Sequence, residues 1–360
     1  MPFRPERRNP LDNAHEICYT CRMAIIVIVG AGMMGSALTF PARKNGHTVR
    51  LVGTPLDGEI IRYARASGEH LTLKRTLPPG VEYFTFDEFG GALRGVDLLI
   101  CGVSSFGVDW FAESILAGVP EGIPILSVTK GLLHVPGGRL LDYPAFWNGK
   151  FPRHCINAIG GPCTSYELAD GAQSSVFFCG RDIDVLRKLK DCMETDNYHV
   201  GLTTDVFGLE CAVALKNAYA LGVTLTVGMT ETAAGKPQYN PQAALFGQSA
   251  REMGKLLSLA GGNPDMLFAG IGDLYVTVFG GRTRLLGTLL GRGVKYTDAL
   301  KELSGITLES TVIAVRTAAA VKELAAEGKA READFPLLMH VNALLTEGKT
   351  VDIPWKAFLK

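Results

Sequence analysis

Residues 24–35 read Ala-Ile-Ile-Val-Ile-Val-Gly-Ala-Gly-Met-Met-Gly, which joins a run of six apolar residues to the pattern Gly-x-Gly-x-x-Gly. The apolar run predicts a buried strand, residues 36–45 a helix kinked at Pro41, and residues 47–52 the next strand. The glycine pattern alone is a weak signal, but between a strand and a helix it is typical of dinucleotide-binding domains. The N-terminal part is therefore predicted to be a Rossmann-type domain with a mostly parallel sheet that binds NAD or NADP.

Each glycine of this turn has its own expected task. Gly30 permits the tight turn, Gly32 lets the backbone approach a pyrophosphate, and Gly35 lets helix and strand pack closely. The helix that follows offers free N–H groups and the positive end of its dipole to the phosphates. Met33 and Met34 belong to the same turn, and we expect them beside the cofactor as well.

The end of the second predicted strand bears on the choice between NAD and NADP. An Asp or Glu usually stands there and binds the adenosine ribose of NAD, whereas this strand ends at Thr54 and Asp57 comes late. Arg62 and Arg65 follow on a helical stretch and could meet the 2′-phosphate of NADP, although a solvated helix face is the commoner role. The pattern slightly favours NADP as the cofactor and does not exclude NAD. Thr54 is expected to contact it.

Further apolar runs predict more strands, and the residues after them are candidate ligand contacts. These runs span residues 96–103, 124–129, 155–159 and 176–179. In an open parallel sheet, ligands bind beyond the carboxyl ends of the strands. Such ends carry Ser104, Phe106, Lys130 and Gly161, and we expect these residues to line one ligand site.

After about residue 203 the strand-like runs largely stop. Helical patterns cover residues 206–229, 243–259, 284–290, 308–327 and 335–345. The sequence therefore predicts an α/β protein in which residues 23–203 form the dinucleotide-binding domain. Residues 204–360 are predicted to form an all-helical domain for substrate binding and dimerisation.

Lys216 lies in the apolar stretch Val206–Met229, whose only other charge is Glu210. Such a composition predicts a helix buried on nearly all sides, and the charges argue against a membrane span. Glu210 stands about 240° away around the helix and cannot easily pair with Lys216. Because a lysine is rarely buried without a partner or a task, we expect Lys216 to face groups from elsewhere in the chain.

The helical half contains one glycine-rich break, residues 270–284, that has a chemical character. Asp273 stands in otherwise uncharged surroundings, and two glycines then present Arg282, Thr283 and Arg284, expected in a turn before a helix. An arginine with a hydroxyl and free backbone N–H groups suits a phosphate, because the guanidinium binds it bidentately. The alternative is a flexible loop with solvated arginines.

Composition excludes several classes of protein. Lys plus Arg equals Asp plus Glu at 36 each, so no overall electrostatic field draws the chain to nucleic acid or to a membrane.

The eight scattered cysteines fit free thiols in a reducing cytosol. Residues 1–22 indicate a disordered arm or a start codon placed too early, and the spacing of Cys18 and Cys21 is insufficient for a metal site. A covalent enzyme with Cys163 as nucleophile is a less favoured alternative.

With these motifs assembled, the chain resembles the NAD(P)-dependent sn-glycerol-3-phosphate dehydrogenases from about Met23 to the C-terminus. The likeness is carried by five motifs in the family's order: 30–35, Thr129-Lys130-Gly131-Leu132, Gly161-Pro162 with Glu167, Leu215-Lys216-Asn217, and Gly272-Asp273-Leu274 followed by Gly280-Gly281-Arg282. The resemblance implies reversible conversion of dihydroxyacetone phosphate to glycerol 3-phosphate. It further implies a cytoplasmic homodimer that feeds phospholipid synthesis.

The resemblance also implies roles for single residues. The expected catalytic residues are Lys216, Lys130 and Asp273. The expected substrate contacts are Arg282, Thr283, Asn217, Thr277 and Gly161. The expected cofactor contacts are Gly30, Gly32, Met33, Met34, Gly35, Thr54, Ser104, Phe106, Lys130, Arg282 and Glu309, with no metal. The chain departs from the family pattern at Cys163, Thr283 and Ser310.

Two other functions fit the same motifs. One is a two-domain dehydrogenase of the same architecture that acts on a different hydroxy acid. The other is a dinucleotide sensor without catalysis, although the set of Lys216, Asp273 and Arg282 argues against it.

Overall fold

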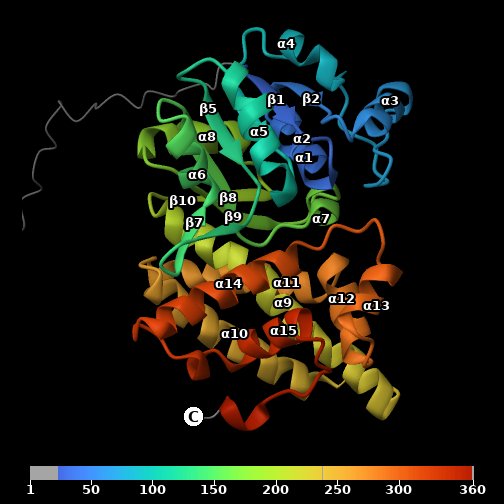
Figure 1. Ribbon diagram of the computed structural model, residues 1–360. Coiled ribbons are helices and arrows are strands. Elements are labelled where there is room, and N and C mark those ends of the chain that lie inside the picture. Colours follow the sequence, from blue (N-terminus) through green and yellow to red (C-terminus); the bar gives the residue numbers. More distant parts are fainter. Residues whose placement is uncertain (1–22, 237, 359–360) are drawn as a thin grey trace, which may run out of the picture.

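The computed structural model describes residues 23–236 and 238–358. Figure 1 shows two halves, a sheet flanked by helices above and a group of helices below. The last strand ends at Thr203, and the long helix α9 begins at Val206. The predictions for residues 1–22, including the cysteine pair, lie outside the described residues.

One sheet of eight strands forms the core of the upper half, in the order β10-β9-β8-β5-β4-β1-β2-β3. The strands are β1 (Ile25–Val29), β2 (Thr48–Val52), β3 (Val81–Phe84), β4 (Leu98–Cys101), β5 (Pro124–Ser127), β8 (Cys155–Gly160), β9 (Ser174–Cys179) and β10 (Tyr198–Thr203). All neighbours run parallel except β8 and β9. The order reverses between β1 and β4, where ligands bind in sheets of this kind. The predicted α/β class is confirmed.

Short helices cover the two faces of this sheet. They are α1 (Met33–Ala37), α2 (Thr39–Lys44), α3 (Gly58–Ser67), α4 (Phe89–Ala92), α5 (Val108–Ser114), α6 (Tyr143–Lys150), α7 (Ser165–Ala169) and α8 (Ile183–Met193). The helix predicted to run to Asn45 with a kink at Pro41 is interrupted at Leu38, which divides it into α1 and α2. Pro41 has no N–H to donate to the carbonyl of Ala37, so the hydrogen-bond ladder breaks there.

A two-stranded hairpin, β6 (Leu132–Val135) and β7 (Arg139–Asp142), projects from the upper half towards α14. The sequence patterns did not predict it, nor did they predict β3 or β10. In all four strands most residues are not fully buried, so these strands lack the continuous apolar run of a central strand.

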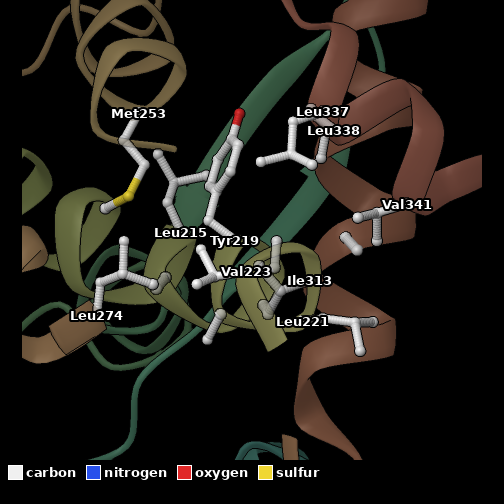
Figure 2. Close-up of a cluster of buried hydrophobic side chains, with 14 of the residues drawn as sticks. Leu215, Tyr219, Leu221, Val223, Met253, Leu274, Ile313, Leu337, Leu338 and Val341 are labelled. Carbon is white, nitrogen blue, oxygen red and sulfur yellow. The ribbon is translucent and has the colours of Figure 1, made fainter. Parts of the chain in front are cut away.

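The helix α9 (Val206–Ala234) is the axis of the lower half. Its neighbours are α10 (Tyr239–Leu259), α11 (Leu267–Val278), α12 (Gly281–Gly291), α13 (Tyr296–Glu302), α14 (Glu309–Ala326) and α15 (Pro336–Thr346). Figure 2 shows Leu215 and Tyr219 of α9 among side chains from α10, α11, α14 and α15. By length and composition α9 could cross a membrane, but 83% of its apolar window is buried by protein.

Glycines bring α11 and α12 unusually close to α9. A Cβ at Gly270 would lie 2.5 Å from the carbonyl oxygen of Ala212, and one at Gly291 only 2.0 Å from that of Leu225. Such distances are possible only where no side chain intervenes. The expected glycine-rich break over residues 270–284 is therefore wrong. These residues form most of α11, a short connection at Gly280 and the start of α12. Gly270 serves helix packing, whereas a Cβ at Gly280 or Gly281 would meet nothing within 4 Å.

Candidate active site

A cavity of about 780 Å³ opens where the strand ends of the upper half meet α9, α12 and α14. It brings together many of the predicted site residues: Gly32, Met33, Met34, Ser104, Lys130, Gly161, Lys216, Asn217, Arg282 and Glu309. Phe106 does not line it and is 60% exposed. Residues 150 or more positions apart in sequence thus converge on one site.

Two lysines from different domains share one buried carboxylate at the inner end of this cavity. Lys216 donates to Oδ1 of Asp273 at 2.9 Å, and Lys130 donates to Oδ2 of the same group. Lys216 also donates to Oγ1 of Thr277 at 2.8 Å, and Lys130 to the carbonyl oxygen of Gly161 at 3.2 Å. Asp273 itself is almost fully buried. The predicted partner of Lys216 from elsewhere in the chain is therefore Asp273.

This arrangement leaves each lysine one free position. An ammonium group has three N–H bonds, and the protein occupies two of them on each lysine. The third position of Lys216 is a donor when the lysine is protonated and a lone pair when it is neutral. Since both lysines line the cavity, that position is available to a ligand.

The two lysines differ in their tendency to hold a proton. Burial lowers the pKa of Lys216, and although Asp273 opposes this, the charge of Lys130 adds to it, so the net shift is downward. Burial also favours a lower pKa for Lys130, but Asp273 more than offsets this and the pKa lies above its ordinary value. Burial alone would raise the pKa of Asp273, yet the two lysines hold it below the usual range. Lys130 is therefore the permanent cation and Lys216 the group suited to exchange a proton.

The glycine turn after β1 has the geometry that a pyrophosphate requires. A Cβ at Gly30 would lie 2.7 Å from the backbone of Gly102, and one at Gly35 only 2.1 Å from the carbonyl oxygen of Gly30. Gly32, by contrast, faces open space within the cavity lining. Gly30 and Gly35 thus shape the turn from behind, while Gly32 allows close approach of a phosphate. These residues fit a dinucleotide.

Asp57 supplies the carboxylate that the second strand lacks at its end. Its Oδ2 accepts hydrogen bonds from the main-chain N–H of Ala31, at 3.1 Å, and from the N–H and hydroxyl of Thr54, both at 2.8 Å. Asp57 lines the cavity, whereas Thr54 does not. Arg65 binds Glu88 and the carbonyl of Tyr83, so one of the two arginines considered for a 2′-phosphate is already engaged.

Arg282 lies in the first turn of α12, not in a turn before that helix. Its guanidinium is 3.9 Å from Glu309 and half exposed towards the cavity, beside the free N–H groups at the helix start. Thr283 is buried and does not line the cavity. Arg284 donates to the carbonyl oxygen of Val278 and thereby caps α11. Of the three residues considered for a phosphate clamp, only Arg282 faces the ligand space.

The covalent alternative finds no support at Cys163. Burial raises the pKa of this thiol to about 11, although Lys130 acts in the opposite direction. The thiol is therefore not a thiolate at neutral pH. The nearest histidine in sequence, His154, is bound to the carbonyl oxygen of Leu116.

Other residues that line the cavity had no recognised signal in the sequence. They are Asp57, Thr72, Gly102, Gly305 and Thr307, among others. Thr72 and Thr307 lie in connecting segments, where neither periodicity nor spacing indicates which residues face a ligand. Asp57 lies beyond the position at which the sequence pattern expects an acid, and the turn that folds it back onto Ala31 has no simple sequence signature.

Comparison with known proteins agrees with this geometry. Residues 25–184 match the family model described as NAD-dependent glycerol-3-phosphate dehydrogenase N-terminus, and residues 205–355 match the corresponding C-terminus. The NADP(+)-dependent glycerol-3-phosphate dehydrogenase of Archaeoglobus fulgidus is 32% identical over 331 residues, which cover 91% of this chain and 97% of that protein. A Mycobacterium avium relative, named glycerol-3-phosphate dehydrogenase [NAD(P)+], is 25% identical and covers 93% and 94%.

A solved structure shows the same fold. Glycerol-3-phosphate dehydrogenase from Coxiella burnetii superposes with a TM-score of 0.76 at 24% identity, over 93% of this chain and 98% of the other. The two family models together match residues 25–184 and 205–355, and the relative that is 32% identical covers 91% of the chain. From these matches, the chain belongs to the NAD-dependent glycerol-3-phosphate dehydrogenase family.

Proposed function

We propose that the chain catalyses reversible hydride transfer between NADH or NADPH and dihydroxyacetone phosphate, giving sn-glycerol 3-phosphate. The observation that carries the proposal is the sharing of buried Asp273 by Lys130 and Lys216 in the cavity that also holds Arg282. In this proposal residues 23–203 bind the cofactor and residues 204–360 bind the substrate.

The phosphate of the substrate is placed at Arg282. Its guanidinium and the unpaired N–H groups at the start of α12 together offer a cation and several donors. The carbonyl oxygen then lies between the free N–H positions of Lys130 and Lys216. Asn217, nearly buried but part of the cavity lining, is available to a substrate hydroxyl. Gly161 contributes by holding Lys130 through its carbonyl.

The protein manages charge and one proton during the reaction. The nicotinamide cofactor, when bound, supplies or accepts the hydride. As the substrate carbonyl is reduced, its oxygen gains negative charge, which Lys130 stabilises as a fixed cation. Lys216 donates its proton to that oxygen, and in the reverse direction neutral Lys216 removes the hydroxyl proton. Burial lowers the pKa of Lys216 from its ordinary value, which serves both directions.

The proposal extends to the setting of the enzyme: a cytoplasmic homodimer whose product serves phospholipid synthesis. Exposed aromatic side chains, Phe268 and Tyr275 on α11 and Phe279 directly after it, support association with a second copy. The free thiols of Cys101, Cys155, Cys163, Cys179 and Cys211 are compatible with a reducing compartment.

Loss of reduced-nicotinamide absorbance on addition of dihydroxyacetone phosphate tests the reaction, with NADH and NADPH run in parallel. Lys216→Ala is expected to keep the fold and cofactor binding and to lose nearly all turnover. Lys188→Ala, on the exposed face of α8, is the matched control and should behave as the native chain. Near-native turnover in Lys216→Ala would refute the assignment, and cofactor binding without turnover in the native chain would favour a sensor.

A further inference from the structure

Arg316 reaches from the middle of α14 across the boundary between the two domains. Its Nη1 donates a hydrogen bond of 2.9 Å to the main-chain carbonyl of Leu132, the first residue of β6. Leu132 stands two positions after Lys130 in the chain. A cation of the helical domain therefore holds the segment that carries Lys130.

Tyr143, the first residue of α6, holds the same segment from another side. A Cβ at Gly131 would lie 2.5 Å from the hydroxyl oxygen of Tyr143 and 2.6 Å from its ring, so the ring lies directly on this backbone. The Tyr143 side chain is almost fully buried, and Arg316 and Ser105 lie close enough to act on its hydroxyl and lower its pKa, although burial has the larger, opposite effect. The two residues that hold the segment are thus also near one another.

These contacts continue to Glu309, which lies two helical turns before Arg316 on α14. Both the N–H and the hydroxyl of Ser105 donate to Oε1 of Glu309, at 2.9 and 2.8 Å. A cation and an anion seven residues apart, on one face of α14, tie the segments that follow β4 and β5.

From this geometry we infer that Arg316 is a positioning residue for Lys130 and acts through the backbone of residues 131–132 without touching the substrate. The inference rests on the proposed function, since it concerns the placement of a lysine in that reaction. Lys130 must reach both Asp273 and the carbonyl of Gly161. A displaced backbone would weaken both contacts at once.

The same displacement has a consequence for Lys216. The groups that act on Lys216 are Asp273 and Glu309, which favour its protonated form, and Lys130, which disfavours it. If Lys130 moves away, Lys216 loses the neighbouring positive charge that helps to lower its pKa. The pH at which glycerol 3-phosphate oxidation reaches half its maximal kcat should then rise. Loss of stability alone would not produce that change.

The test compares Arg316→Met, which keeps much of the side-chain shape, with Arg316→Lys and with Glu323→Gln. Glu323 is on the same helix and binds His134 and the N–H of Gly138 at the far end of the hairpin, so its variant loosens the hairpin without touching Tyr143. Measurements are kcat and KM in both directions, the pH profile of oxidation, cofactor affinity by fluorescence titration, and thermal unfolding.

Arg316→Met should lower kcat by about 10- to 100-fold, the effect of a displacement near 1 Å at a catalytic group, and move the pH midpoint upward. Arg316→Lys should restore part of both, and Glu323→Gln should leave both unchanged. An unchanged kcat and midpoint in Arg316→Met would overturn the inference. So would equal losses in Arg316→Met and Glu323→Gln that follow thermal stability alone.

If Arg316→Met does not fold, Tyr143→Phe decides the matter, because it removes only the hydroxyl that lies against the backbone of Gly131 and near Arg316. A few-fold loss of kcat with the same upward midpoint supports the inference, and native behaviour refutes it. The proposed function fails separately, when the native chain does not reduce dihydroxyacetone phosphate or when Lys216→Ala retains turnover.

Discussion

Gly287→Ala tests whether the contact between α9 and α12 sets the position of Arg282. A Cβ at Gly287 would lie 2.0 Å from Oγ1 of Thr224 and 2.7 Å from its Cβ. Rotation of the Thr224 hydroxyl would break the hydrogen bond of 2.7 Å that it donates to the carbonyl oxygen of Ala220. Even with the hydroxyl turned away, two carbons at 2.7 Å must separate to about 3.5–4.0 Å. The helix α12 must therefore move by roughly 1 Å.

Arg282 lies five residues before Gly287 on the same helix, so it should move with it. A misplacement of about 1 Å at a binding group costs up to about 100-fold in rate, and overpacking costs about 1–3 kcal/mol of stability. We therefore expect kcat/KM for dihydroxyacetone phosphate to fall by about 10- to 100-fold and the Tm to fall, with the affinity for NADH nearly unchanged.

The assay is steady-state NADH oxidation with thermal unfolding measured on the same samples. Gly247→Ala is the control, because Gly247 lies on the exposed side of α10 and a Cβ there meets nothing within 4 Å. That variant should be native in rate and equal or higher in Tm, by the usual preference of a helix for alanine. A lowered Tm with native kcat/KM in Gly287→Ala would show that this contact does not place Arg282.

Three further changes have distinct expected outcomes. Lys130→Met should move the pH midpoint of glycerol 3-phosphate oxidation upward. Lys216 then keeps Asp273 but loses a neighbouring cation, so its pKa rises. An unchanged or lowered midpoint in the kcat profile would contradict this. Arg282→Ala should raise KM for dihydroxyacetone phosphate by about 10- to 150-fold, the value of a charged hydrogen bond, and an unchanged KM would make Arg282 a bystander. Glu252→Gln should lower the free energy of unfolding by about 1–3 kcal/mol, measured with denaturant, and leave KM native. The reason is that Glu252 accepts hydrogen bonds from Tyr219, Gln248 and two main-chain N–H groups at the start of α15. Native stability would contradict this.

The parts of the fold that sequence predicts are those where one physical requirement dominates. The run Ile25–Val29 is a central strand covered on both faces, so it must be continuously apolar. The helix α9 is buried on nearly every side and has the matching composition. The hairpin at residues 132–142 meets no such requirement, because half-exposed strands of four residues tolerate many compositions.

The same distinction holds for the site. Lys216 and Asp273 stand out in the sequence because a charge in apolar surroundings needs a partner, and Lys130 stands out because it follows a predicted strand. In the structure both lysines bind Asp273. The glycines of residues 270–287 are ambiguous in sequence, since a glycine permits a turn and also permits close packing. At Gly270 and Gly287, the nearby helix α9 shows that the glycine serves close packing, and α9 comes from another part of the chain. Thr72 and Thr307 have no signal of either kind.

The charges around the reacting group explain why two lysines share one aspartate. With Lys216 protonated, Lys130, Lys216 and Arg282 oppose Asp273 and Glu309, so the site carries a net positive charge that suits a phosphorylated ketone. In the proposed reaction, once Lys216 has given its proton to the new hydroxyl, these five groups sum to a net charge of zero, which weakens the attraction for the phosphorylated product. Without Lys130, the pKa of Lys216 would lie higher and this lysine would release its proton less readily. The shared aspartate holds both lysines in place, and the lowered pKa of Lys216 beside the raised pKa of Lys130 makes Lys216 the better proton donor of the two.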